Sequence, residues 1–132
     1  MIDIENIVVN NVANAVWAEF SDAIVSSDYD PTPTKMPTVY IYEASNTSYD
    51  SFDDENVDHH VNVMYVVDCF ALTKSQAKRL RDITDAAMMG MKFTRDYSAP
   101  TLNVDRTIKR YTSRYTAIVG ELTNNVYQMY RS

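Results

Sequence analysis

The strictest constraint on the fold is a run of residues, 57–71, whose side chains alternate between two kinds. The odd positions carry Val57, His59, Val61, Val63, Tyr65, Val67, Cys69 and Ala71, and the even positions include Asp58, His60, Asn62 and Asp68. Successive side chains of a β-strand point to opposite faces, so this pattern predicts a strand with one buried face. At ~3.3 Å per residue it would span about 50 Å, well beyond a usual strand. We therefore expect a long hairpin strand, one end of which projects from the body.

The chain before this strand predicts a helix, a linker and the first hairpin strand. Residues 3–25 place apolar side chains at helical spacing, with Asp3 as a possible N-cap. Three prolines make 26–37 a linker. Residues 38–44 are rich in β-branched and aromatic side chains and predict a strand. The polar, acidic segment 45–56 would then be the hairpin loop.

The chain after the long strand predicts a second helix and further strands. Residues 74–89 have helical spacing, Thr73 and Gln76 form a plausible capping box, and Gly90 suits the left-handed position after the helix. Residues 91–97 could form a short strand before a turn at Pro100, and 110–119 and 122–130 predict two more. The expected fold is therefore one α+β domain over 1–132. Its mixed, mainly antiparallel sheet contains a long hairpin and is flanked by an N-terminal and a central helix.

Composition narrows the class of protein. A chain of 132 residues can bury a core without disulfides, and its one cysteine allows no intrachain bridge, which fits a reducing compartment. With 2 glycines it has no Gly-rich phosphate loop. The first residues lack the basic and apolar regions of a signal peptide, and no apolar run is long enough for a membrane span. We expect a protein that stays inside the cell that makes it, with no membrane partner.

Charge is divided unequally along the chain. Residues 1–72 carry thirteen acidic and one basic side chain, and residues 73–132 carry eleven basic and five acidic ones. The first segment thus has a formal charge of −12 and the second +6, within a total of −6. The acidic total argues against simple wrapping of nucleic acid. The asymmetry indicates that one surface can attract another.

Candidate catalytic and metal-binding residues are few. His59 and His60 follow several acids, but neighbours on a strand point to opposite faces, so they cannot share an ion without a bulge. The acidic loop lacks a calcium-loop pattern. Cys69 falls on the apolar face, where a cysteine behaves as a small hydrophobe. No nucleophile–base or paired-carboxylate site stands out, so we expect no enzyme, no metal and no cofactor.

Basic side chains crowd two segments. One group is Lys74, Lys78, Arg79 and Arg81, and the other is Arg106, Lys109, Arg110 and Arg114. With Tyr111 and Tyr115 nearby they could contact nucleic acid. We favour contacts with a neighbouring subunit, because the chain supplies its own acidic partner surface. The candidate interface pairs Asp53, Asp54 and Glu55 of one copy with Lys78, Arg79 and Arg81 of the next.

The order of these segments resembles the tail terminator (tail-completion) proteins of long-tailed bacteriophages. The similarity lies in MPTVYIYEA at 36–44, the long alternating strand, TKSQAKRLRDITDAAMMGMKF at 73–93, NVDRTIKRYTSRYTAIVGE at 103–121 and VYQMY at 126–130. It covers about residues 36–132, with a looser match in the first helix. Related head-completion and minor tail proteins share much of this pattern.

The resemblance implies a structural virion protein, without enzymatic activity or cofactor, assembled in the host cytoplasm. It would form a homohexameric ring in the neck region, at the head-proximal end of the tail tube. There it would stop tube polymerisation and bind a head-completion or connector protein. DNA would pass through the ring without specific binding, so we expect an acidic or neutral pore wall. The alternatives are a head-completion or head–tail connector protein, or a cellular protein-binding adaptor.

Overall fold

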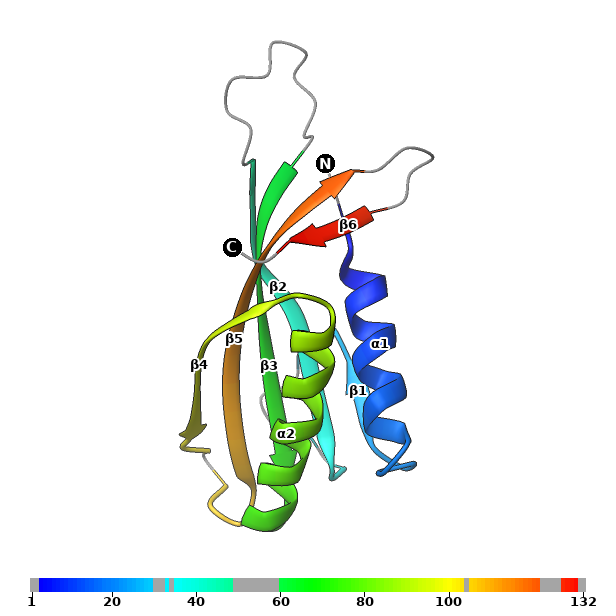
Figure 1. Cartoon of the computed structure of the whole chain (residues 1–132). Helices are drawn as coiled ribbons and strands as arrows, with labels where there is room; N and C mark the ends of the chain where they lie inside the picture. Colours follow the sequence, from blue (N-terminus) through cyan, green and yellow to red (C-terminus); the bar gives the residue numbers. More distant parts are fainter. Residues whose placement is uncertain are drawn as a thin grey trace.

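A computed structural model describes residues 3–29, 33, 35–48, 60–103, 105–121 and 127–130, which form two helices and six strands (Figure 1). In chain order they are α1 (Glu5–Trp17), β1 (Ile24–Ser26), β2 (Thr38–Ser48), β3 (His60–Ala71), α2 (Lys74–Gly90), β4 (Thr94–Thr101), β5 (Lys109–Glu121) and β6 (Tyr127–Tyr130). The strand order is β1-β2-β3-β5-β4, and β6 pairs with β5 beyond the residues that β4 occupies. All pairs are antiparallel except β1 with β2. The predicted α+β class and mixed, mainly antiparallel sheet are therefore confirmed.

Strand β3 lies at the centre of the sheet, and its odd positions form the core. Val61, Val63, Tyr65 and Val67 are almost fully buried, and β5 places Tyr115, Ala117 and other odd residues directly beside them. Both helices cover this face of the sheet (Figure 1). Helix α1 buries Val8, Val12, Ala13 and Val16 there, and α2 buries Ala77, Leu80, Thr84 and Met88.

The long strand is paired along its whole described length. Every residue from His60 to Ala71 has a partner in β5, and Val61 to Phe70 have partners in β2. The described part of β3 is therefore a central strand of the sheet, and the projection of one end stays a prediction. Residues 57–59, which the prediction assigned to this strand, lie outside the described part.

The first helix is shorter than predicted, because the chain turns at Trp17 and enters the sheet. The amides of Glu19 and Phe20 both donate to the carbonyl of Val16, and the Trp17 indole donates to the Ala23 carbonyl at 2.8 Å. Residues 24–26, predicted to lie at the helix end and linker start, then form β1 beside β2. The β-branched residues Ile24 and Val25 continue the helical spacing of apolar residues, yet they are equally suited to an extended strand.

Other strands begin or end at residues that differ from the predicted boundaries. Strand β2 runs on to Ser48 past a bulge between Glu43 and Ser45, and β5 runs from 109 to 121. Pro100 lies within β4 and not at a turn; β4 is an edge strand, where a missing amide hydrogen is tolerated. The predicted strand 122–130 corresponds to β6 at 127–130, and 122–126 lie outside the described residues.

The two ends of α2 satisfy their backbone groups differently. At the start, the Thr73 hydroxyl accepts from the Gln76 amide at 3.2 Å, as the capping box predicts. At the end, the Lys92 amide donates to Met89 and the Phe93 amide to Met88, which is the Schellman arrangement. The left-handed residue is Lys92, with φ of 72°, and not Gly90, which is the last helical residue.

Replacing Lys92 with glycine should stabilise the protein. A side chain in the left-handed region costs about 1 kcal/mol, and glycine avoids this cost. We expect Lys92→Gly to raise the free energy of unfolding by about 0.5–1 kcal/mol in urea denaturation. Lys92→Ala removes the same charge but keeps Cβ, so it is the matched control. Equal stability of the two variants would contradict this account.

Candidate interaction surfaces

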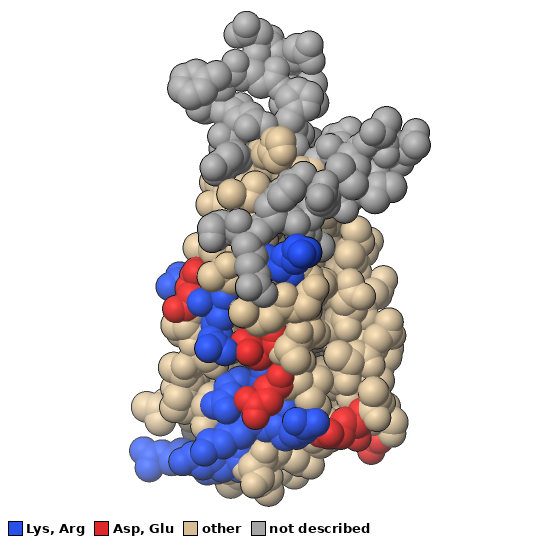
Figure 2. Space-filling model, viewed as in Figure 1, with Lys and Arg blue, Asp and Glu red and all other residues tan. Residues whose placement is uncertain are grey.

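Basic side chains gather at one end of the molecule, where β3 ends and α2 and β5 begin. Figure 2 shows Lys and Arg over the lower part of α2 and the end of the sheet below it, with a few acids between them. The acidic segment of the sequence connects β2 and β3, whose joined ends are at the other end of the sheet (Figure 1). The structure thus places one group of basic side chains at one end of the described subunit, while most acidic residues of the segment between β2 and β3 lie outside the described part.

Two of the three basic residues in the predicted interface already have carboxylate partners. Arg79 forms two hydrogen bonds with Glu19, at 2.7 and 2.8 Å, and these lower the pKa of the Glu19 carboxyl. Arg81 pairs with Asp82 at 2.9 Å, and its guanidinium lies 5.0 Å from the centre of the Tyr111 ring.

Lys78 is exposed on α2 beside these two arginines. The acidic members, Asp53, Asp54 and Glu55, lie outside the described residues. Contact between the two groups across subunits therefore stays a prediction.

A hollow of about 590 Å³ opens beside the start of α2 and combines basic and apolar side chains. Its lining includes Lys74, Pro100, Leu102, Arg106, Ile108, Lys109, Arg110 and Tyr111. Leu102 is 95% exposed, which is unusual for a large apolar side chain. Within the described part of the chain, Lys74, Arg106 and Lys109 form no ion pair, so their charges remain available to another molecule.

The fourth basic side chain of the hollow, Arg110, is committed to a buried carboxylate. Its Nε and Nη2 atoms donate to the two oxygens of Asp68 at 3.2 and 3.1 Å, and Thr112 donates to the same carboxylate. Asp68 is fully buried, although it lies on the sheet face opposite the helices. Tyr29 and Phe70 pack near the guanidinium, at 5.8 and 5.2 Å from ring centre to Cζ.

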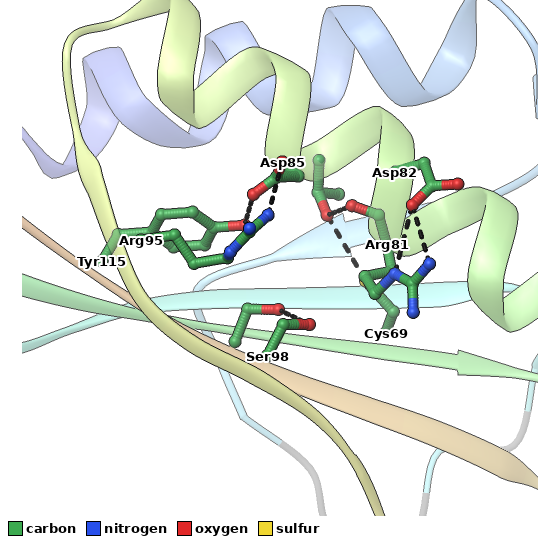
Figure 3. A network of polar contacts seen from close by, with 9 residues as sticks. Cys69, Arg81, Asp82, Asp85, Arg95, Ser98 and Tyr115 are labelled. Carbon is green, nitrogen blue, oxygen red and sulfur yellow. Dashed lines mark hydrogen bonds and ion pairs between the residues drawn. The ribbon is translucent and has the colours of Figure 1, made fainter.

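A second polar group joins α2 to the sheet (Figure 3). The Tyr115 hydroxyl donates to Asp85 at 2.8 Å, and Arg95 of β4 pairs with the other oxygen of Asp85 at 2.9 Å. Burial and the neighbouring carboxylate raise the pKa of the Tyr115 phenol, so the hydroxyl keeps its proton and remains a donor. The three residues belong to three elements, and the contacts hold α2 in register on the sheet.

Cys69 is buried in the core and is no nucleophile in this state. Its sulfur lies 3.6 Å from the Thr84 hydroxyl (Figure 3), and burial raises the pKa of the thiol to about 12. Nucleophilic attack requires the thiolate, which is scarce at neutral pH with such a pKa.

His60 begins β3, and His59 lies outside the described residues. Among the residues that the structure describes, no group of three or more His, Cys, Asp or Glu side chains is placed to bind a metal ion. In the same residues, neither helix is long and apolar enough to span a membrane.

The Asp68–Arg110 and Asp85–Tyr115 contacts were not predicted from the sequence. Asp68 occupies an even, polar position of the strand, which by alternation alone should face solvent. Its partner lies 42 residues away along the chain, and only the pairing of β3 with β5 brings the two together. The available signal was Tyr29 in the proline-rich segment before β2, since its ring packs beside this pair.

No model of a known protein family matches the chain, and no curated protein sequence matches it. The fold and the surfaces therefore define only a class: an α+β protein with both helices on one face of its sheet and a basic hollow at one end.

Removing the buried carboxylate should strongly destabilise the fold. We expect Asp68→Ala to cost about 3–5 kcal/mol in chemical denaturation, because it leaves the Arg110 guanidinium unpaired in a largely buried site. Adding Arg110→Met should recover part of the loss. The control, Asp82→Ala, removes an exposed partner of Arg81 and should change stability by less than about 0.5 kcal/mol. An equally small effect of Asp68→Ala would refute the assigned role.

Proposed function

We propose that this protein forms a ring that terminates the tail tube of a long-tailed bacteriophage and provides the surface that joins the head. The segments that carry the resemblance to tail terminators include β2, β3, α2, β5 and β6. The α+β fold with a mostly antiparallel sheet agrees with what that resemblance implies. The proposed location is the neck of the virion, after assembly in the host cytoplasm.

The main physical support is the division of charge along the chain, together with the basic hollow at one end of the described subunit. The basic hollow lies where β3 ends, and the acidic segment 49–59 joins the chain where β3 begins. An interface between unlike patches is heterologous, and it closes into a ring when the rotation between copies allows. A two-fold dimer would instead bring like patches together more easily. Exposed ion pairs contribute only ~0.2–1 kcal/mol each, so they would orient the subunits while buried apolar surface supplies most of the affinity.

Native mass spectrometry tests the ring directly. We expect a closed assembly of six copies, with a mass six times that of the 15.1-kDa chain. Raising the salt concentration should weaken the assembly, because exposed charges are screened beyond ~8–10 Å at physiological ionic strength. A protein that stays monomeric at high concentration, with and without tail-tube protein, would contradict the proposal.

A tube-capping assay separates the neighbouring candidates. A terminator added to growing tail tubes should stop their elongation at one end, as seen by electron microscopy. A head-completion or connector protein would form a ring without capping the tube. An adaptor would do neither.

The assembled ring should bind duplex DNA only weakly. DNA that passes through a pore must not adhere to its wall, and phosphate contacts to Lys and Arg are the source of sequence-independent affinity. The basic side chains are therefore expected to contact other subunits or tail proteins, which leaves the pore acidic or neutral. We expect no tight binding of a labelled linear duplex at about 0.15 M salt in fluorescence anisotropy. Tight binding that falls steeply with rising salt would indicate an open nucleic-acid surface instead.

A further inference from the structure

We propose that the hollow beside the start of α2 is the docking site for the acidic segment 49–59 of a second copy of this chain. The inference rests on the proposed ring and specifies its contact. It differs from the sequence-based hypothesis, which assigned the acidic segment to Lys78, Arg79 and Arg81.

The hollow has the chemistry of a site for an acidic segment that also carries apolar side chains. Lys74, Arg106 and Lys109 surround it, and none of them forms an ion pair within the described part of the chain. The rest of its lining includes the apolar side chains of Pro100, Leu102 and Ile108, and Leu102 is almost fully exposed. An occupant with carboxylates alone would leave this apolar surface in water, whereas an occupant with carboxylates and an apolar side chain would cover both.

The segment that joins β2 to β3 supplies both kinds of side chain. Its acidic residues are Asp50, Asp53, Asp54, Glu55 and Asp58, and its apolar residues include Phe52 and Val57. No Lys or Arg occurs anywhere between positions 36 and 73, so the segment has no internal basic partner close in sequence. The segment and the hollow therefore carry opposite charges, and each also carries apolar side chains.

The geometry of β3 requires that the two sites come from different copies. The segment is attached where β3 begins, and the hollow includes Lys109 and Tyr111, which pair with Ala71 and Cys69 near the end of β3. The 12 residues of β3 separate these ends by about 36 Å at ~3.3 Å per residue. Eleven residues anchored at both ends extend at most about 20 Å from their anchors. The segment cannot reach the hollow of its own chain, so docking links one subunit to the next.

The alternative acceptor on α2 is less suited, because its arginines are already paired. Arg79 would have to release a two-point contact with Glu19, and Arg81 would have to release Asp82. Lys74, Arg106 and Lys109 of the hollow would release no carboxylate partner among the described residues. New ion pairs therefore cost less to form at the hollow.

Charge reversal with a matched control tests the site. The first variant is Lys74→Glu, Arg106→Glu and Lys109→Glu, at three exposed positions. The control is Lys78→Glu, Arg79→Glu and Arg81→Glu on α2. The acidic segment is reversed by Asp53→Lys, Asp54→Lys and Glu55→Lys. This acid reversal is made alone and in combination with each of the two basic variants. The association constant of each full-length protein is measured by sedimentation at about 0.15 M salt, with circular dichroism to verify folding.

We expect reversal of the hollow, or of the acids, to weaken association by about tenfold or more. Their combination should restore most of the loss, whereas the α2 variant combined with the reversed acids should not. Two results would overturn the docking site and leave the ring proposal standing. One is that the α2 variant restores the association of the protein with reversed acids, and the other is that reversal of the hollow has no effect on an intact ring. Rescue by the hollow variant in an open polymer would support the docking site and contradict the ring. A monomeric wild-type protein would refute both.

Discussion

The structure depends on the central position of β3, which is hydrogen-bonded on both sides along nearly all of its length. The alternation of side chains along β3 then determines which face of the sheet the helices cover. The odd side chains, such as Val63 and Tyr65, form a continuous apolar surface that both helices cover, and burial of each is worth ~1.5–3 kcal/mol. A shift of one residue in register would expose this whole surface to water and bury the even, polar positions. The register of the sheet and the position of the helices are therefore fixed together.

The opposite face of the sheet follows a different rule. Neither of the two described helices covers it, yet Asp68 and Phe70 are fully buried there. Aromatic rings from the segment before β2 and from the strands contact one another edge to face, with Tyr29, Tyr40 and Phe70 at centroid distances of 5.4 and 5.7 Å. The Arg110 guanidinium completes this group and neutralises Asp68. On this face the Tyr29 ring therefore contributes contacts that the helices make on the other face.

The pairing of charges within the subunit determines which of them a partner can use. Arg79, Arg81, Arg95 and Arg110 each bind a carboxylate of their own chain, so a partner could use these charges only in competition with that carboxylate. The hollow beside α2 keeps basic side chains without such partners and adds apolar surface to them. The hollow is thus distinguished from the basic surface of α2 because its unpaired basic side chains have no carboxylate partner in the described part of the chain. The number of positive charges does not distinguish the two surfaces.

The sequence by itself determined the fold class, because its signals were local: period-two alternation in β3, and helical spacing and the Thr73 cap in α2. The tertiary structure decided what depends on partners distant in sequence. Ile24 and Val25 form a strand because β2 lies beside them, and Asp68 is buried because β5 brings Arg110 to it. For the same reason the sequence could identify the basic groups. Only the fold shows which basic side chains pair with a carboxylate of their own chain, as Arg79 and Arg110 do, and which do not. The spacing of residues along a chain predicts which face of a helix or strand a side chain occupies. Only the tertiary structure determines which residues that side chain contacts.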